Sequence, residues 1–252
     1  AHLPVILGPD GAKLSKRHGA TSALEYAAQG FLPDAMFNFL GMLGWSLDDK
    51  TDILSRDEFI AHFSLERVTK NPAVFNIEKL TWMNGVYIRD MPEERLVTVF
   101  ADRLEQDLPA RAQRPIDRER VRRIAPLIRE RVKVLSELVD YCDFFFVDNA
   151  VPPVDELLGK AYAGREADAK AALGRAVAVA EGVDPWSHEA LEAALRALAT
   201  ELGAKAGDLF SLIRIAVTGR KISPPLFETM EVLGRERSLA RMRAAGELLR
   251  GA

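Results

Sequence analysis

The chain has 252 residues, of which 48% are hydrophobic and 28% charged, a composition typical of a globular protein with two or three small cores. No apolar run approaches the length of a membrane span and no charged-then-apolar leader opens the sequence, so we expect a cytoplasmic protein without a membrane partner. The net charge of -3 argues against a general nucleic-acid binder, and the single Cys142 excludes an internal disulfide and a cysteine-based zinc site.

The first predicted element is a short hairpin that leads into a basic loop. The apolar run 3–7 predicts a strand, and the Pro-Asp-Gly sequence at 9–11 predicts a tight turn. Lys13, Lys16 and Arg17 then place three cations within five residues. A flexible, glycine-flanked loop of this charge suits a polyphosphate whose charge grows during a reaction. From the residues alone, an ordinary solvated basic turn is the alternative.

Helical patterns follow this loop as far as residue 92. Pro33 is suited to the first turn of a helix, and Ser55 with a glutamate three residues later has the sequence of a capping box. Asn76 precedes a longer apolar pattern and is suited to cap it. We therefore predict helices over 22–29, 33–44, 56–63 and 77–87, the last capped by Asn76.

Beyond residue 92 the patterns are helical throughout, and Pro126 should kink or divide one of these helices. Adjacent prolines within 147–155 mark the clearest domain boundary. Cys142 has aromatic neighbours and is predicted to be a core thiol, whereas His188 is predicted to be a surface residue. The predicted helices cover 92–108, 116–132, 133–146, 167–180, 188–202, 207–217, 226–233 and a last segment from 235.

Two stretches of this acidic chain are basic. Residues 111–133 carry a surplus of six positive charges, and residues 213–243 carry a surplus of four. Such a distribution favours a directed phosphate-binding surface over general stickiness, although solvated helix faces would give the same pattern.

Several segments together resemble one enzyme family. Lys-Leu-Ser-Lys-Arg at 13–17, followed by His-Gly-Ala, resembles the lysine-rich signature loop of class I aminoacyl-tRNA synthetases in the form found in glutamyl-tRNA synthetases. Segments 63–75, 78–85 and 217–228 resemble that family in the same order. The His-x-Gly-His motif of the family is missing from this sequence. The chain is therefore identified as the C-terminal half of a glutamyl-tRNA synthetase, expected to be inactive alone.

The resemblance implies a mainly α fold, in which a mixed stem-contact unit with a short N-terminal hairpin precedes an all-helical anticodon-binding region. The implied domains are a signature-loop and stem-contact domain at 1–92 and two helical anticodon-binding domains at 93–150 and 151–252. The implied activity of the full-length enzyme is activation of glutamate with ATP and Mg²⁺, followed by transfer to tRNA(Glu). We expect a monomer with no cofactor or metal bound by protein ligands of this chain.

The resemblance also assigns residues of the loop. Lys16 is the main catalytic group, assisted by Lys13 and Arg17, because positive charge over the departing phosphates lowers the barrier. Lys13, Ser15 and Lys16 are expected to bind the phosphates of ATP. Leu14 and Arg17 stand where the general signature has methionine and serine, as is usual for glutamate enzymes.

For the tRNA, the resemblance assigns Arg131 to the last anticodon base and a later segment to other anticodon contacts. That later set comprises Arg214, Ser223, Pro224, Pro225 and Leu226. Pro225 departs from a Thr-Pro-Gly form, and a rigid proline there alters how closely the backbone can approach a base. Arg131 could instead be a surface arginine paired with Glu137 or Asp140.

Three alternatives to a glutamyl-tRNA synthetase were considered, and the sequence disfavours the first two. Glutaminyl-tRNA synthetase has a similar loop but uses β-barrels for the anticodon, and the truncated paralogue that glutamylates a modified tRNA base lacks an anticodon region. A non-catalytic tRNA-binding or interaction module is the alternative from another class. These residues are compatible with a parent enzyme that charges tRNA(Glu) alone and with one that also charges tRNA(Gln).

Overall fold

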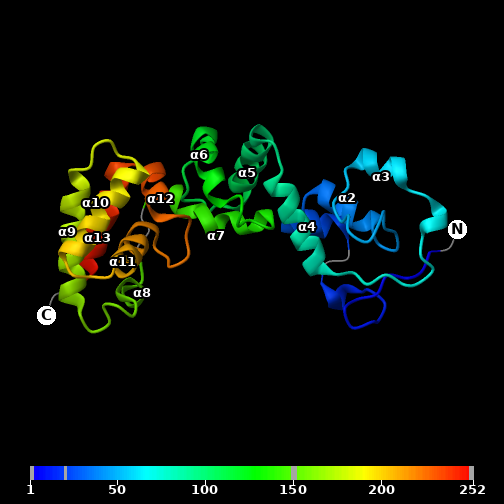
Figure 1. Cartoon of the computed structure of the whole chain (residues 1–252), viewed down its shortest axis with the longest axis horizontal. Helices are drawn as coiled ribbons and strands as arrows, with labels where there is room; N and C mark the ends of the chain where they lie inside the picture. The colour runs from blue at the N-terminus through cyan, green and yellow to red at the C-terminus, as the bar shows by residue number, and fades with distance from the viewer. Residues whose placement is uncertain (1–2, 20–21, 149–151, 250–252) are drawn as a thin grey trace. The chain divides into compact units, whose positions relative to one another are not determined.

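The computed structural model describes residues 3–19, 22–148 and 152–249, and within these ranges the chain is mainly α-helical (Figure 1). The chain forms two compact units. Unit 1 comprises residues 1–103 and 129–138, and unit 2 comprises residues 104–128 and 139–252. The three-domain division stays a prediction. Within the described ranges, no helix is long and apolar enough to cross a membrane.

Unit 1 contains the helices predicted from capping signals. They are α1 (Ala23–Gln29), α2 (Pro33–Gly41), α3 (Arg56–His62), α4 (Ile77–Arg89) and most of α5 (Glu93–Asp107). The Ser55 hydroxyl accepts the N–H of Glu58 at 3.2 Å, and the side-chain amide oxygen of Asn76 accepts the N–H of Lys79 at 3.0 Å. Both caps are therefore confirmed, because each satisfies an N–H that has no partner within its helix.

The core of unit 1 joins segments far apart in the sequence. Its buried cluster comprises Tyr26, Phe31, Phe39, Phe75, Leu80, Met83 and Val134. Buried Asn84 accepts the N–H of Leu32 at 2.7 Å and donates to the carbonyl of Lys133 at 2.6 Å. Gly30, with φ of 93°, accepts the N–H of Leu135 at 3.1 Å and approaches that residue too closely for a Cβ. Residues 129–138 are thus part of unit 1.

The predicted N-terminal hairpin is not formed as two paired strands. Within 3–19 the chain folds back through one isolated antiparallel bridge between Leu7 and Lys13. The other edge of Leu7 pairs with residues 73–75, where its N–H donates to Ala73 and its carbonyl accepts from Phe75. Past Leu14 the backbone enters a 3₁₀ turn over Lys16–His18, which ends any further pairing. A mixture of helices and strands was expected for this unit. Its described residues form helices and isolated β-bridges but no strand.

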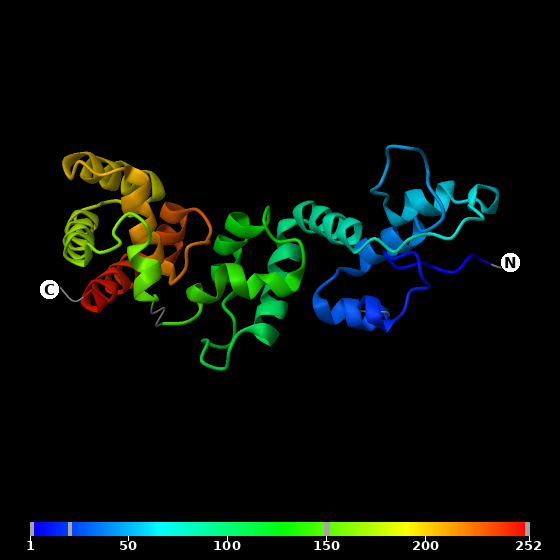
Figure 2. The same ribbon diagram turned by 90° about the horizontal axis from the view of Figure 1, so that it is seen from below.

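Unit 2 is an assembly of helices. Its elements are α6 (Arg118–Ile128), α7 (Leu138–Cys142), α8 (Val154–Leu158), α9 (Glu166–Glu181), α10 (His188–Glu201), α11 (Ala206–Thr218), α12 (Leu226–Leu233) and α13 (Arg235–Leu248). Helix α13 lies beside α9 and also contacts α11, as Figures 1 and 2 show. The all-helical character predicted for this part is confirmed for the described residues.

Two predicted helices end early. Helix α6 contains Pro126 and ends at Ile128, so the helix is not divided at this proline but is shorter than predicted. The predicted helix over 133–146 is divided into α7 and the 3₁₀ turns Leu135–Glu137 and Asp143–Phe145. The carbonyls of Phe144, Phe145 and Val147 accept hydrogen bonds from arginines of α13. Side chains thus replace the helical partners of this backbone, and Cys142 is buried as predicted, which raises the pKa of its thiol.

Candidate functional site

The signature loop, residues 8–19, is held by its own polar groups. The Asp10 carboxylate accepts the N–H of Ala12 at 3.0 Å, and the N–H of Gly8 donates to the carbonyl of Ala12 at 2.7 Å. Gly11 has φ of 75°, a conformation that favours glycine. The Pro-Asp-Gly turn predicted from the sequence therefore closes the loop at its first half.

His18 lies at the centre of this loop, and its side chain is only 7% exposed. Its Nδ1 accepts the N–H of Ser15 at 3.1 Å, while its Nε2 lies 3.1 Å from a carboxylate oxygen of Asp10. Nε2 also lies 3.3 Å from Arg17 Nε, so this nitrogen is in contact with both members of the Asp10–Arg17 ion pair. The hydrogen bond from Ala12, followed by that from His18, holds the pKa of Asp10 below its usual value. His18 thus connects the two halves of the loop, a role that the sequence analysis did not assign.

The three cations of the loop remain at its surface. Lys13, Lys16 and Arg17 are exposed, and Arg17 forms an ion pair with Asp10 at 3.1 Å. Ser15 is half-buried, with its hydroxyl 3.3 Å from His18 Nδ1. A pocket of about 510 Å³ opens beside the loop and is lined by Leu14, His18, Tyr26 and residues 74–78 among others. The geometry is suited to an exposed phosphate chain, since lysine ammonium groups can reach an anion without losing internal partners.

The residues predicted to contact the tRNA lie in both units. Arg131 is exposed in unit 1, and the other five belong to unit 2. The Glu137 carboxylate, one alternative partner for Arg131, accepts the backbone N–H groups of Lys133 and Val134 at 2.8 and 3.2 Å. This carboxylate therefore caps the turn after Arg131, and the base-reading role of Arg131 stays a prediction.

The unit 2 residues meet at the 219–225 loop, which connects α11 to α12. One guanidinium nitrogen of Arg214 donates to the Ser223 hydroxyl and to the Pro224 carbonyl, both at 2.7 Å. Ser223 and Leu226 are each 3% exposed and Pro224 is buried, whereas Pro225 is exposed. Arg214 thus positions the loop, while most of the assigned segment faces the interior.

Two residues of this loop that the sequence analysis did not select face outward. Lys221 is exposed, and the side chain of Ile222 is 72% exposed. The neighbouring Arg220 instead binds Asp143, with a distance of 2.7 Å, and the carbonyl of Asp140. One feature of the sequence could have identified Ile222. It lies between a lysine and a Ser-Pro-Pro turn and belongs to no helical or strand pattern of apolar residues.

The basic stretch 213–243 is largely engaged inside unit 2. Arg241 is 5% exposed and donates to the carbonyls of Val217, Phe144 and Val147 at 2.8, 2.7 and 2.6 Å. Arg237 donates to the carbonyls of Phe145 and Val147, each at 2.9 Å. Desolvation lowers the pKa of Arg241 to about 10. These arginines fasten α13 to the irregular turn at 143–147 and contribute little to an outer surface.

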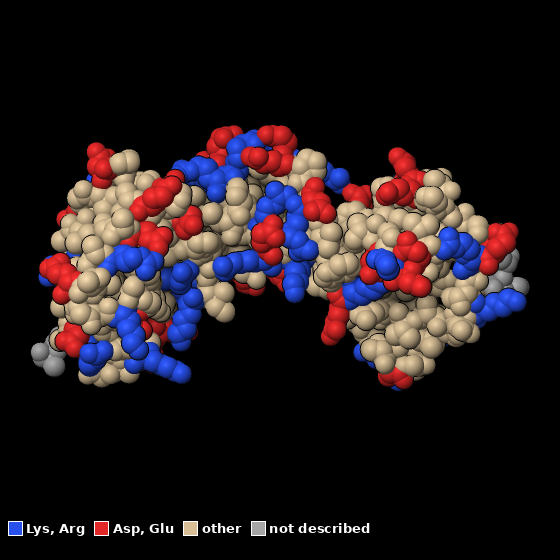
Figure 3. Space-filling model, in the orientation of Figure 1, with Lys and Arg blue, Asp and Glu red and all other residues tan. Residues whose placement is uncertain are grey.

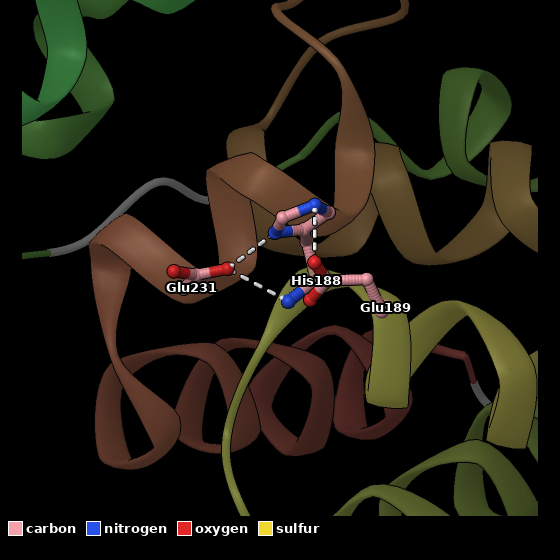
Figure 4. Close-up of side chains that lie close together, drawn as sticks. All are labelled: His188, Glu189 and Glu231. Atoms are coloured by element: carbon pink, nitrogen blue, oxygen red, sulfur yellow. Dashed lines mark hydrogen bonds and ion pairs between the residues drawn. The ribbon is translucent and has the colours of Figure 1, made fainter.

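His188, Glu189 and Glu231 are the groups within the described ranges that could hold a metal ion (Figure 4). Glu231 Oε2 accepts the backbone N–H of His188 at 2.7 Å and lies 2.8 Å from its Nδ1, while Nε2 lies 3.2 Å from Glu189. The hydrogen bond with Glu231 raises the pKa of His188. Both ring nitrogens of His188 are thus paired with a carboxylate, and the contacts with Glu231 anchor the start of α10 to α12.

Side chains of both signs cover the face of the molecule seen in Figure 3. Over the part of unit 2 around α8 and α11, lysine and arginine side chains gather near the lower border of this view. The 219–225 loop contributes exposed Lys221 to the surface of unit 2, while its Arg220 is half-buried against Asp143. A local positive surplus of this kind attracts a polyanion even when the net charge of the chain is negative.

Two family profiles match the chain. Residues 97–246 match the anticodon binding domain, and residues 1–82 match the catalytic domain of class I tRNA synthetases of the E and Q type. The matches divide the sequence between the part that carries the signature loop and the part that carries the 219–225 loop.

Individual relatives agree with these profiles. A glutamate–tRNA ligase of Dehalococcoides mccartyi strain 195 is 46% identical over 245 residues, covering 97% of this chain and 50% of the relative. A ligase of the same description from Roseiflexus sp. RS-1 is also 46% identical, over 97% of this chain and 48% of the relative. The chain therefore spans about half the length of the curated relatives it matches.

A solved structure has the same fold. The crystal structure of a glutamate tRNA ligase from Elizabethkingia meningosepticum, in complex with its amino acid, superposes with a TM-score of 0.85 at 28% sequence identity. The match covers 99% of this chain and 51% of that one.

Proposed function

Because the chain belongs to the glutamate–tRNA ligase family, of which it comprises the tail of the class I catalytic domain and the anticodon-binding domain, we propose that it binds tRNA(Glu) for aminoacylation. Within the whole enzyme, glutamate is activated with ATP and transferred to this tRNA. By itself the chain would act as a non-catalytic tRNA-binding module, since the His-x-Gly-His motif is not in its sequence.

The observation that carries the proposal is the 219–225 loop at the end of α11. It lies within the matched anticodon-binding domain and presents Lys221 and Pro225 outward from a framework fixed by Arg214. Groups that are already held in place are well suited to bind unpaired RNA bases. Their side chains lose little conformational entropy when the RNA binds. Arg131 in unit 1 is the second proposed contact and would read the last anticodon base.

The signature loop supports the catalytic part of the proposal. Lys16, Lys13 and Arg17 would act on the phosphates of ATP, and Ser15 would shape the backbone that presents them. Their exposure fits this role, because a substrate anion can displace water from an exposed ammonium group without breaking a buried contact. Mg²⁺ bound with ATP would neutralise further phosphate charge.

The experiment is binding of labelled tRNA(Glu) to the chain, measured by fluorescence anisotropy from low to high salt. We expect the logarithm of affinity to fall steeply and linearly with the logarithm of salt concentration, because phosphate contacts release counterions. Affinity that does not change with salt would contradict the proposal. A tRNA of the same length with another anticodon serves as the control for base reading. Comparing tRNA(Gln) in the same assay tests discrimination, and cytoplasmic location and a monomeric state remain predictions.

A further inference from the structure

Ile222 is unusual among the large apolar side chains of unit 2. Within the described residues of this unit, exposed large hydrophobic side chains occur only at Leu202, which is 37% exposed, and at Ile222, which is 72% exposed. A single exposed apolar residue is common on protein surfaces and needs no function by itself. The position of Ile222 in a fixed loop is what gives its exposure a consequence.

The loop around Ile222 is held on both sides. Before it, Gly219 adopts φ of 76°, and the Thr218 hydroxyl lies within hydrogen-bond distance of the Arg220 carbonyl at 3.1 Å. The Arg220 guanidinium is fixed by Asp143, at 2.7 Å. After it, Arg214 binds Ser223 and Pro224. The loop is thus anchored to α11 and, through Arg220, to the turn Asp143–Phe145, and it holds Ile222 at the surface.

The two cations of the 219–225 loop, Arg220 and Lys221, have different surroundings. Arg220 donates to Asp143 and Asp140, so its cation stabilises the protein. Lys221, the next residue, is exposed. Two consecutive residues of the loop, an apolar one and a lysine, are therefore exposed to solvent. Unpaired nucleotides offer the complementary pair, a base face and a phosphate.

We propose that Ile222 packs against the face of an unpaired base of the bound RNA, while Lys221 neutralises an adjacent phosphate. The proposal rests on the proposed tRNA-binding function and names two contact residues for it. RNA is the occupant favoured here because the loop lies within the matched anticodon-binding domain and carries Lys221 as an exposed cation beside Ile222 in the sequence. An apolar protein partner would make no use of Lys221 and would bind without steep salt dependence.

The test uses the chain as it exists and a labelled RNA hairpin with the anticodon stem and loop of tRNA(Glu). We expect Ile222→Ala to weaken binding by about tenfold, since burying most of an isoleucine side chain contributes ~1.5 kcal/mol. The matched control is Leu202→Ala, which truncates the other exposed apolar residue of unit 2 and should leave affinity unchanged. Both substitutions are at the surface, so thermal unfolding should be unaltered.

Lys221→Ala should differ from Ile222→Ala in salt dependence. The lysine variant should reduce the slope of log affinity against log salt by about 1, whereas the isoleucine variant should leave that slope unchanged. Equal slopes for all variants would remove the phosphate part of the proposal.

A double-mutant cycle identifies the base. Loop nucleotides are replaced one at a time by abasic sites, and each RNA is tested with the wild-type chain and Ile222→Ala. One abasic position should abolish the penalty of the substitution, because the contact is already absent. If wild type binds the hairpin but Ile222→Ala behaves like Leu202→Ala, the inference is wrong while tRNA binding stands. If wild type does not bind the hairpin or tRNA(Glu), the proposed function fails with it.

Discussion

The signature loop of unit 1 and the basic stretch of unit 2 use cationic side chains in opposite ways. In the loop, Lys13 and Lys16 are exposed on a backbone held by His18 and Asp10. In unit 2, Arg237 and Arg241 turn inward and donate to backbone carbonyls of 144–147. The first set is available to a ligand, and the second set stabilises the fold.

The comparison shows that a local charge surplus is ambiguous until burial is known. Lysine is a flexible point charge, whereas the planar guanidinium of arginine can donate to several carbonyls at once. An irregular turn with unpaired buried carbonyls requires such donors, because each unsatisfied group costs about 1–3 kcal/mol. Much of the positive charge in 213–243 therefore satisfies the backbone of its own unit.

The largest expected effect concerns the exposed lysines of the signature loop. In a ligase that includes the nucleotide-binding half, Lys16→Ala should slow glutamate activation by roughly 100- to 1,000-fold, as for other groups that stabilise transition-state charge. Pyrophosphate exchange measures this rate. Because Lys16 is exposed, the unfolding midpoint of the chain should not change. A loss of stability equal to that of a core variant would show that the loop lysine is structural.

The next largest effect concerns the buried arginines of unit 2. Arg241→Ala should destabilise unit 2 by about 3 kcal/mol, since it removes the arginine donor of the Val217 and Phe144 carbonyls and leaves the Val147 carbonyl with Arg237 alone. Urea unfolding followed by circular dichroism measures the change. Arg243→Ala is the control, because its exposed ion pair with Glu181 contributes at most about 1 kcal/mol. Equal stability of the two variants would contradict the assignment of Arg241 to the framework.

A third prediction concerns Arg131, an exposed cation close to the boundary of the units in sequence. Arg131→Ala should weaken tRNA(Glu) binding by about 1–3 kcal/mol if the side chain reads a base. The measurement compares tRNAs that differ only at the last anticodon position. An equal loss for all of them would reassign Arg131 to the phosphate backbone.

The smallest expected effect is the pH dependence of stability that arises from His188 in unit 2. Glu231 raises the pKa of His188 above its ordinary value of 6.5, so the ion pair contributes fully below that value. The contribution is lost as the pH rises through the elevated pKa of the folded state. Unfolding midpoints should therefore fall slightly more between pH 6 and pH 8 in wild type than in His188→Gln. An NMR titration of His188 with a midpoint at or below 6.5 would contradict this prediction.

The helices were the part most accessible to sequence reasoning. Ser55 and Asn76 carry their own capping partners within three residues, so the local pattern alone determined where α3 and α4 begin. The hairpin and the helix over 133–146 were wrong because both depended on distant partners. Leu7 pairs with 73–75, and the turn at 143–147 is satisfied by α13.

The same distinction applies to the candidate sites. The order of lysines and glycines in the signature loop was enough to select Lys13, Lys16 and Arg17, while the central contact of His18 with Asp10 and Ser15 became visible only in three dimensions. In the 219–225 loop and at the start of α12, sequence resemblance selected Ser223, Pro224 and Leu226, which are buried.

By itself, the sequence determined the family, the helical character and the position of the signature loop, because these depend on local order and periodicity. Tertiary structure decided which cations face solvent and which face the backbone. It also decided that Ile222 is exposed while its neighbour Ser223 is buried. Burial results from packing between segments that are distant in sequence, and no local pattern contains that information.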